Sequence, residues 1–143
     1  MPGEIIEALE VLMFEAIGLT AVALATVAAG ELTLAQWRAL VVLGRRPAVR
    51  VGEIAAAIGG SLPSTSRLVQ RLERRGLVAT ERDATDRRAT LVSLTAKGQA
   101  LREDVITARR QAMEAALAAR APRLPRGLAP GLSAIARAFD PYR

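Results

Sequence analysis

One segment, residues 77–95, constrains the fold more than any other. It contains LVATERDATDRRATLVSLT, in which two short runs rich in Val, Leu and Thr flank a charged middle. This pattern predicts a β-hairpin with strands at residues 77–82 and 89–94. The connection, DATDRR, is too long for a two-residue turn, and it carries Arg87 and Arg88, which have no core to join.

The acidic residues of this connection leave two roles open for Arg87 and Arg88. Asp83 and Asp86 suit turn positions, because their carboxylates can accept hydrogen bonds from nearby backbone N–H groups. They could also pair with the two arginines, or with an arginine on a helix, and so hold the loop. Alternatively, the guanidinium groups face DNA, where the negative potential of a narrow minor groove favours arginine. Both roles can hold at once, and we expect at least one of the two arginines to contact DNA.

Helical patterns surround the hairpin. Thr33 and Gln36 form a capping-box pattern, Ser61 and Thr95 are suited to cap helices, and Gly76 is suited to end one. Glycine and proline interrupt the periodic segments in GRRP, in GG and in PRLPRG. Helices are expected at residues 4–29, 34–43, 51–58, 62–75, 96–120 and 128–139.

The fourth of these helices, LPSTSRLVQRLERR, has two different faces. Its apolar stripe is formed by Thr65, Leu68, Val69 and Leu72. A solvated face explains many charged helix surfaces, but a face with Glu73 as its only acid is unusual for solubility alone. The residues of that face are Ser64, Ser66, Arg67, Gln70, Arg71 and Arg74.

The basic charge of the chain is unevenly distributed. The formal net charge is +6 over 143 residues, and the isoelectric point is about 11.3. Residues 1–37 carry a net −5, residues 38–88 carry +6 and residues 89–143 carry +5. A basic centre beside an acidic first helix indicates a polyanionic partner. An arginine-rich source genome is an alternative explanation of the isoelectric point, but it does not sort the charge by segment.

Cys and His are both absent from the sequence. This absence excludes disulfides, thiol redox sensing and thiolate metal sites, and it removes the commonest transition-metal ligand and general base. Catalysis would rest on carboxylates, most of which lie on helix faces or in the hairpin connection. We therefore expect no enzyme activity, no catalytic residue, no metal site and no cofactor.

The first helix is strongly apolar. Its longest uncharged run, AIGLTAVALATVAAG at residues 16–30, is too short to span a bilayer comfortably, and Glu10, Glu15 and Glu31 bracket it. No basic segment precedes the run, so a secretory signal is not indicated. The expectation is a helix buried on most sides, against a second copy of itself, with no membrane partner.

The order helix, helix, helix–turn–helix, hairpin, helix, helix predicts a winged helix, which is mainly α with a small β-hairpin wing (α+β). Three motifs then carry a family resemblance: R-L-V-x-R-L-E-x-x-G-L-V at residues 67–78, D-x-x-D-R-R at 83–88 and L-T-x-K-G at 94–98. Together they resemble the DNA-binding core of the MarR family of bacterial transcriptional regulators, over about a third of the chain. The chain departs from the pattern at Arg50, where Ser or Thr commonly caps the third helix.

The resemblance implies one domain over residues 1–143, with a winged-helix DNA-binding core at about 32–95 and dimerisation helices at 4–29 and 96–140. It also implies a cytoplasmic, nucleoid-associated homodimer that binds double-stranded DNA at a pseudo-palindromic operator and acts as a repressor. The apolar first helix and the stripe of residues 128–139 independently favour a dimer. The alternative is a winged-helix module for DNA architecture or protein contact, without operator specificity.

The resemblance also assigns residues to DNA contact. Arg45, Arg46 and Arg50 precede the third helix and could add contacts with the DNA backbone, whereas Thr65 fits the core equally well by its spacing. The residues assigned to DNA contact are Ser64, Thr65, Ser66, Arg67, Gln70, Arg71, Arg74, Arg87 and Arg88.

Members of the family often bind small aromatic or anionic effectors between the dimer helices and the DNA-binding lobe. In this chain Met13, Phe14, Ile17 and Trp37 are candidates to line such a pocket, with Arg38 near a ligand carboxylate. Ordinary core packing explains the same residues, and it is the favoured interpretation.

Overall fold

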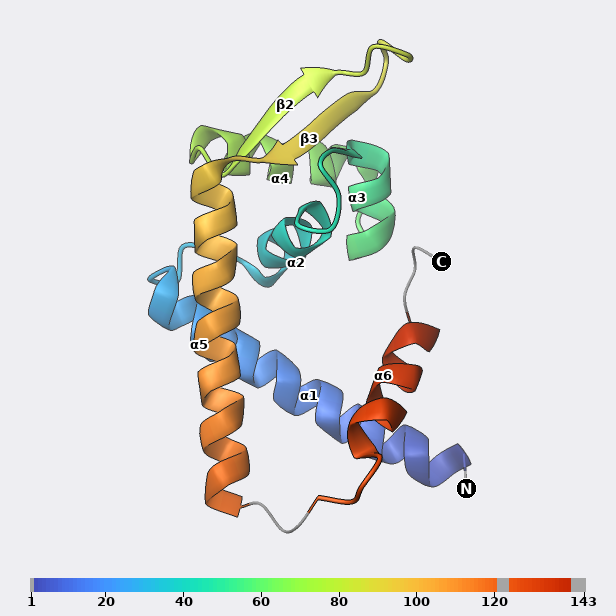
Figure 1. Cartoon of the computed structure of the whole chain (residues 1–143). Helices are drawn as coiled ribbons and strands as arrows, with labels where there is room; N and C mark the ends of the chain where they lie inside the picture. Colours follow the sequence, from blue (N-terminus) through green and yellow to red (C-terminus); the bar gives the residue numbers. More distant parts are fainter. Residues whose placement is uncertain (1, 121–123, 140–143) are drawn as a thin grey trace.

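The computed structural model describes residues 2–120 and 124–139 (Figure 1). The predicted class, mainly α with a small β-hairpin wing, is confirmed, and α2, α3 and α5 have the predicted bounds. The elements are α1 (Pro2–Val27), α2 (Leu34–Leu43), β1 (Val49–Arg50), α3 (Val51–Ile58), α4 (Leu62–Arg74), β2 (Val78–Arg82), β3 (Thr90–Leu94), α5 (Ala96–Arg120) and α6 (Leu128–Ala138).

The sheet has one strand more than the hairpin pattern predicts. Its order is β1-β3-β2, and all neighbours are antiparallel. The additional strand, β1, pairs Val49 with Val92 and Arg50 with Leu91, and it leads directly into α3. Two residues are too few to show the alternation by which a strand is recognised in a sequence. This short strand nevertheless joins the start of α3 to the wing.

Side-chain caps begin the helices where the sequence predicts them. Thr33 Oγ1 accepts a hydrogen bond from the backbone N–H of Gln36 (3.2 Å), and the Gln36 side chain accepts one from the N–H of Thr33 (3.0 Å). This is the expected capping box at α2. Ser61 and Thr95 likewise cap α4 and α5 through their hydroxyl oxygens.

Two glycines allow the chain to turn into and out of the wing. Gly76 follows α4 with a φ of +69°. Its N–H donates to the carbonyl of Glu73 while that of Leu77 donates to Leu72, which is a Schellman motif. Gly98 lies in the first turn of α5, where a Cβ atom would overlap the carbonyl oxygen of Leu77. The two glycines therefore determine how closely α4 and α5 approach the wing.

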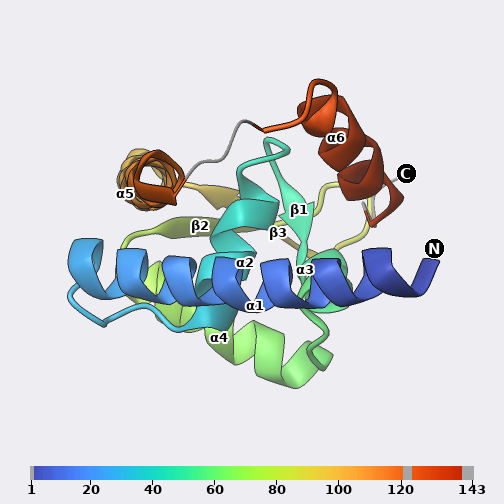
Figure 2. The same ribbon diagram turned by 90° about the horizontal axis from the view of Figure 1, so that it is seen from below.

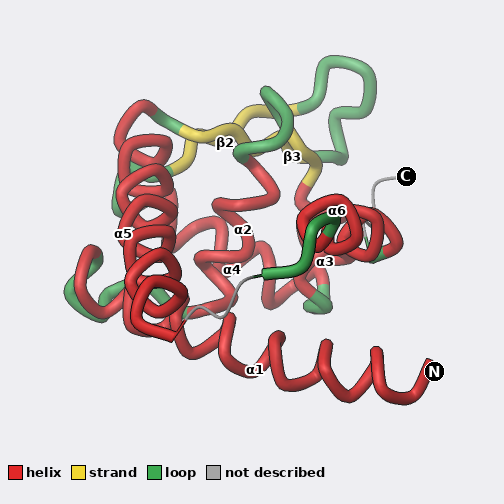
Figure 3. Tube along the Cα trace, turned by 60° about the horizontal axis from the view of Figure 1, so that its bottom comes forward, coloured by secondary structure: helices red, strands yellow, loops and turns green. Residues whose placement is uncertain are grey.

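One cluster of buried apolar side chains joins the winged helix to the long helices. Figure 3 shows that the strands are confined to one end of the molecule, beside the beginning of α5. Helices α2, α3, α4 and α5 and both main strands contribute to the cluster. Its largest fully buried side chains include Leu40, Leu43, Ile54, Leu72, Leu77, Val92 and Val105.

Helix α1 has a buried end and an exposed end. Near its C-terminus Ala23 and Leu24 belong to the core. Figures 1 and 2 show its N-terminal half projecting away from the winged helix, in the same direction as α6, whose described residues include none that is buried. By length and composition alone α1 is long and apolar enough to cross a membrane. The C-terminal part of α1 nevertheless packs against α5 and contributes to the core, as a helix of a folded domain does.

Candidate nucleic-acid interface

The apolar stripe of α4 holds this helix against the core. Val69 and Leu72 are buried, Leu68 is partly buried, and Thr65 is 0% exposed. Thr65 lies one turn before Val69, on the same inner face. The expectation that Thr65 faces DNA is therefore corrected, and the alternative that its spacing fits the core is the right one.

The opposite face of α4 is open to solvent. Within the part of the chain that the structure describes, none of its three arginines has an ion pair or a hydrogen bond from its guanidinium group. Arg75, by contrast, points away from this face and forms an ion pair with Glu31 (2.9 Å). The exposed residues of α4 on this open face are Ser64, Arg67, Gln70, Arg71 and Arg74, with Ser66 partly buried beside them.

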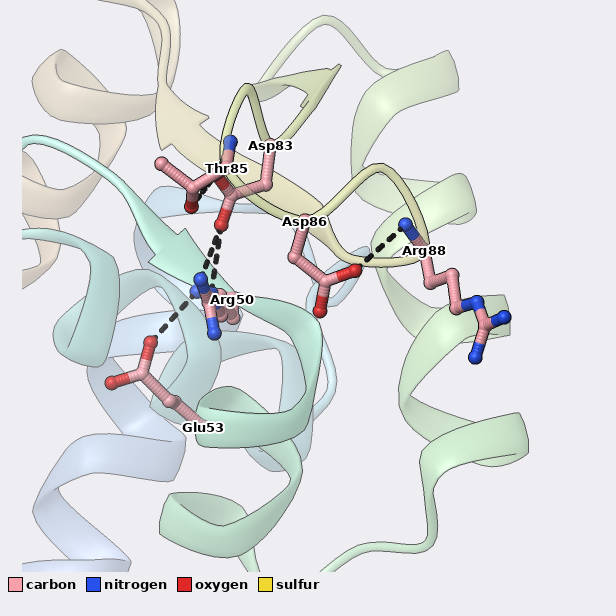
Figure 4. A network of polar contacts seen from close by, with 6 residues as sticks. All are labelled: Arg50, Glu53, Asp83, Thr85, Asp86 and Arg88. Atoms are coloured by element: carbon pink, nitrogen blue, oxygen red, sulfur yellow. Dashed lines mark hydrogen bonds and ion pairs between the residues drawn. The ribbon is translucent and has the colours of Figure 1, made fainter.

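The two aspartates fold the wing tip, as Figure 4 shows. The Asp83 carboxylate accepts hydrogen bonds from the backbone N–H of Thr85 (2.9 Å) and from its hydroxyl (2.8 Å). The Asp86 carboxylate accepts one from the backbone N–H of Arg88 (3.1 Å). Both aspartates therefore hold the loop as turn chemistry predicts. Within the described residues, neither pairs with the guanidinium group of Arg87 or Arg88.

Asp83 forms its ion pair with Arg50, at the junction of β1 and α3. Arg50 Nε and Nη2 both donate to the same carboxylate oxygen, at 2.9 and 2.6 Å. Arg50 is a further candidate for contact with the DNA backbone, but two of its guanidinium N–H groups are engaged inside the protein. No sequence motif reveals this pair, because the partners are 33 residues apart and the short strand β1 brings them together.

These contacts lower the pKa of the acidic groups around the junction. Hydrogen bonds from the backbone and hydroxyl of Thr85, and then those from Arg50, lower the pKa of Asp83 from 3.8 to about 2. The backbone N–H of Arg50 and the side chain of Arg46 donate to Glu53 and lower its pKa below 4.5. Both carboxylates are ionised at neutral pH, so opposite charges alternate from the start of α3 to the wing.

The wing tip and the start of α4 line one hollow of about 410 Å³. Arg50 and Glu53 contribute to one wall, Leu62 and Ser66 of α4 to another, and Arg88 to the edge formed by the wing. Arg88 therefore lies on the side of the molecule that carries the open face of α4. A ligand long enough to cover the wing tip and the open face of α4 would contact side chains of both elements.

The five effector candidates are not brought together by the structure. Trp37 is 3% exposed and belongs to the core, as the favoured interpretation has it. Arg38 donates to a carbonyl oxygen near the end of α3, at 2.9 Å. The remaining candidates lie exposed on α1: Met13, Phe14 and Ile17.

Comparison with known proteins assigns this architecture to a family. Residues 31–89, from the turn before α2 to the wing tip, match the family model described as MarR family. Over its winged-helix core this chain is therefore similar to the MarR family. The curated protein named "Uncharacterized HTH-type transcriptional regulator YfiV", from Bacillus subtilis (strain 168), is 26% identical over 110 residues. The match covers 77% of this chain and 69% of that relative.

Solved structures share the whole architecture. RV1404 from Mycobacterium tuberculosis superposes with a TM-score of 0.84 and 27% identity, covering 96% of this chain and 93% of its own. A mutant of S. aureus MepR, bound to an oligodeoxyribonucleotide, has the same fold, with a TM-score of 0.64, 23% identity and 92% coverage of each chain. The winged-helix class is thus confirmed, and the chain has the fold of MarR-type regulators, whose known members are not enzymes, in line with the expectation.

The lowered pKa of Asp83 predicts how acid acts on the wing. Its folded-state pKa lies below the unfolded value, so its contribution to stability is complete above about pH 4 and is lost as the pH falls towards 2. The free energy of unfolding of the wild type, minus that of Asp83→Asn, should therefore shrink over this interval. An NMR titration of the Asp83 carboxyl carbon checks the cause directly, and a midpoint near 3.8 would contradict it.

Proposed function

We propose that this chain is a MarR-family regulator that binds double-stranded DNA sequence-specifically, as a homodimer on a pseudo-palindromic operator. The observation that carries the proposal is the placement of unpaired cationic side chains. The arginines on the open face of α4 and the wing arginines lie on one side of the fold. The acids around them are engaged elsewhere: Asp83 and Asp86 inside the wing, and Glu73 with the hydroxyl of Thr80. Unpaired arginine clustered on one face is the electrostatic footprint of a nucleic-acid site.

Helix α4 and the wing carry side chains suited to the two grooves of DNA. Helix α4 presents Ser64, Ser66, Arg67 and Gln70 from its first turns, and side chains from that part of a recognition helix contact base edges in the major groove. Arginine and glutamine can each form paired hydrogen bonds with a base. Arg88 extends from the wing towards the neighbouring minor groove, where arginine is favoured. The DNA in the MepR complex supports this proposal by analogy of fold.

The apolar surface of the long helices supports a dimer. The projecting half of α1 exposes Ile5, Ile6, Leu12 and Phe14, the last at 76%. Helix α6 and the end of α5 add further apolar side chains, among them Leu132. A single chain of this size seldom leaves so much apolar surface open to water. A second copy is the proposed cover, because it would also place two recognition helices for the two halves of a palindromic site.

We propose that this dimer is a cytoplasmic, nucleoid-associated protein and that it acts as a repressor. A dimer on an operator occupies promoter DNA and so blocks transcription. Release by a small aromatic or anionic effector is the accompanying proposal. In a dimer the exposed residues Met13, Phe14 and Ile17 would lie at the interface, where a ligand could change the spacing of the two recognition helices.

The proposed DNA contact predicts the behaviour of Arg88→Ala. Loss of a minor-groove arginine should weaken binding to a duplex selected from a random library by about 1–3 kcal/mol, with the dimer intact. Fluorescence anisotropy over a salt series measures this change. The matched control is Arg110→Ala, which removes the same charge from an exposed position on α5.

The wild type should prefer the selected duplex over a scrambled one by about a thousandfold or more. Equal affinity for both duplexes would replace the proposal with an architectural role. An unchanged affinity in Arg88→Ala would remove the wing from DNA recognition.

The proposed dimer leads to a prediction of its own. Phe14→Glu should raise the dimer dissociation constant at least about a hundredfold, because burying an unpaired carboxylate in an apolar interface costs several kcal/mol. Analytical ultracentrifugation measures the change. Gln70→Glu, which adds the same charge on the exposed face of α4, should leave the dimer intact. A Phe14→Glu protein that sediments as the wild-type dimer would place the interface elsewhere.

A further inference from the structure

We infer that Arg50 is a positioning residue that holds the wing at the angle at which Arg88 and α4 act on the same DNA. The inference rests on the proposed DNA-binding function, and it adds a residue whose side chain need not touch DNA. The network that carries it runs from α3 to the wing tip (Figure 4).

The contact between Arg50 and Asp83 is strong and well oriented. Nε and Nη2 of Arg50 converge on one carboxylate oxygen, and Thr85 occupies the other oxygen through two hydrogen bonds. The side chain of Asp83 is 9% exposed, against 46% for Arg50. Charge-assisted hydrogen bonds of this kind are about twice as strong as neutral ones. Without Arg50, one oxygen of a buried carboxylate would lose both of its protein donors.

The base of the Arg50 side chain is itself fixed. The residue pairs with Leu91 across the sheet, and its N–H donates to Glu53 Oε2 (3.0 Å). Glu53 also accepts from Arg46 (2.9 Å). Glu53 thus makes the contact with the N–H of the cap residue that the acidic member of a capping box makes. Arg50 has no side-chain oxygen to accept from the N–H groups of α3, and its side chain reaches Asp83 instead.

The wing tip has few other restraints. The ladder between β2 and β3 ends at the pair Arg82–Thr90. Beyond it, the N–H of Asp83 donates to the carbonyl of Ala89, and the N–H of Ala89 donates to the carbonyl of Asp86. These bonds shape the tip but do not connect it to the helices. Arg50 makes that connection, and it thereby reduces the conformational freedom that Arg88 would lose on binding DNA.

The test compares Arg50→Met, Asp83→Asn and Arg88→Ala, alone and combined, on the selected duplex. Arg50→Met keeps the length of the side chain, and Arg110→Met is the control for loss of charge. Arg50→Met should weaken binding about tenfold, which lies within the range for residues coupled in one network. Asp83→Asn should weaken it similarly, and the double variant should be no worse than either single variant. Hydrogen exchange in the free protein should be faster at residues 83–89 of Arg50→Met and unchanged in α4.

Coupling to Arg88 distinguishes positioning from direct contact. In the Arg50→Met background, Arg88→Ala should lose most of its effect, whereas Arg67→Ala should keep its full effect. Two results would overturn the positioning role while the proposed function stands. One is that Arg88→Ala weakens DNA binding in the Arg50→Met background by as much as it does in the wild type. The other is that Arg50→Met binds DNA as tightly as the wild type does. If the wild type binds no duplex at all, the proposed function itself fails and the positioning role falls with it.

Discussion

The pairing of Arg50 with Asp83 determines which charges of the wing face outwards. A loop with two aspartates and two arginines could neutralise itself, and its arginines would then be unavailable to a ligand. Instead, Asp83 is satisfied by Arg50 and Thr85, and Asp86 by a backbone N–H. The guanidinium groups of Arg87 and Arg88 keep no partner among the described residues. A third arginine, Arg50, thus leaves the two arginines at the wing tip available to a ligand.

The sequence predicts those parts of the fold that depend on local chemistry. Capping residues such as Thr33 and Ser61, and the glycine after α4, act through neighbours within a few positions, so their effects can be recognised in a linear pattern. The two main strands alternate over five residues each, which is enough for recognition. Strand β1 has only two residues, and its identity depends on pairing with a segment about forty positions later.

In the candidate site, too, local patterns are predictable from the sequence and contacts between distant residues are not. Helical periodicity separates the outer face of α4 from its inner stripe, but it leaves Thr65 at the boundary, and packing against the core decides its side. The role of Arg50 follows from a contact across 33 residues, which no local pattern encodes. The projecting half of α1 is equally ambiguous, because an apolar helix has the same composition whether a core, a second chain or a bilayer covers it. The burial of Ala23 and Leu24 near its C-terminus connects it to the folded domain.

In the proposed complex α4 and the wing tip contact DNA together, while the long helices contact a second chain. Hydrogen exchange of the full chain, with and without a saturating selected duplex, tests this arrangement. We expect slower exchange on DNA addition in the first two turns of α4 and at residues 83–89, with no change in the projecting half of α1. Slower exchange in α1, with α4 and the wing unaffected, would contradict it.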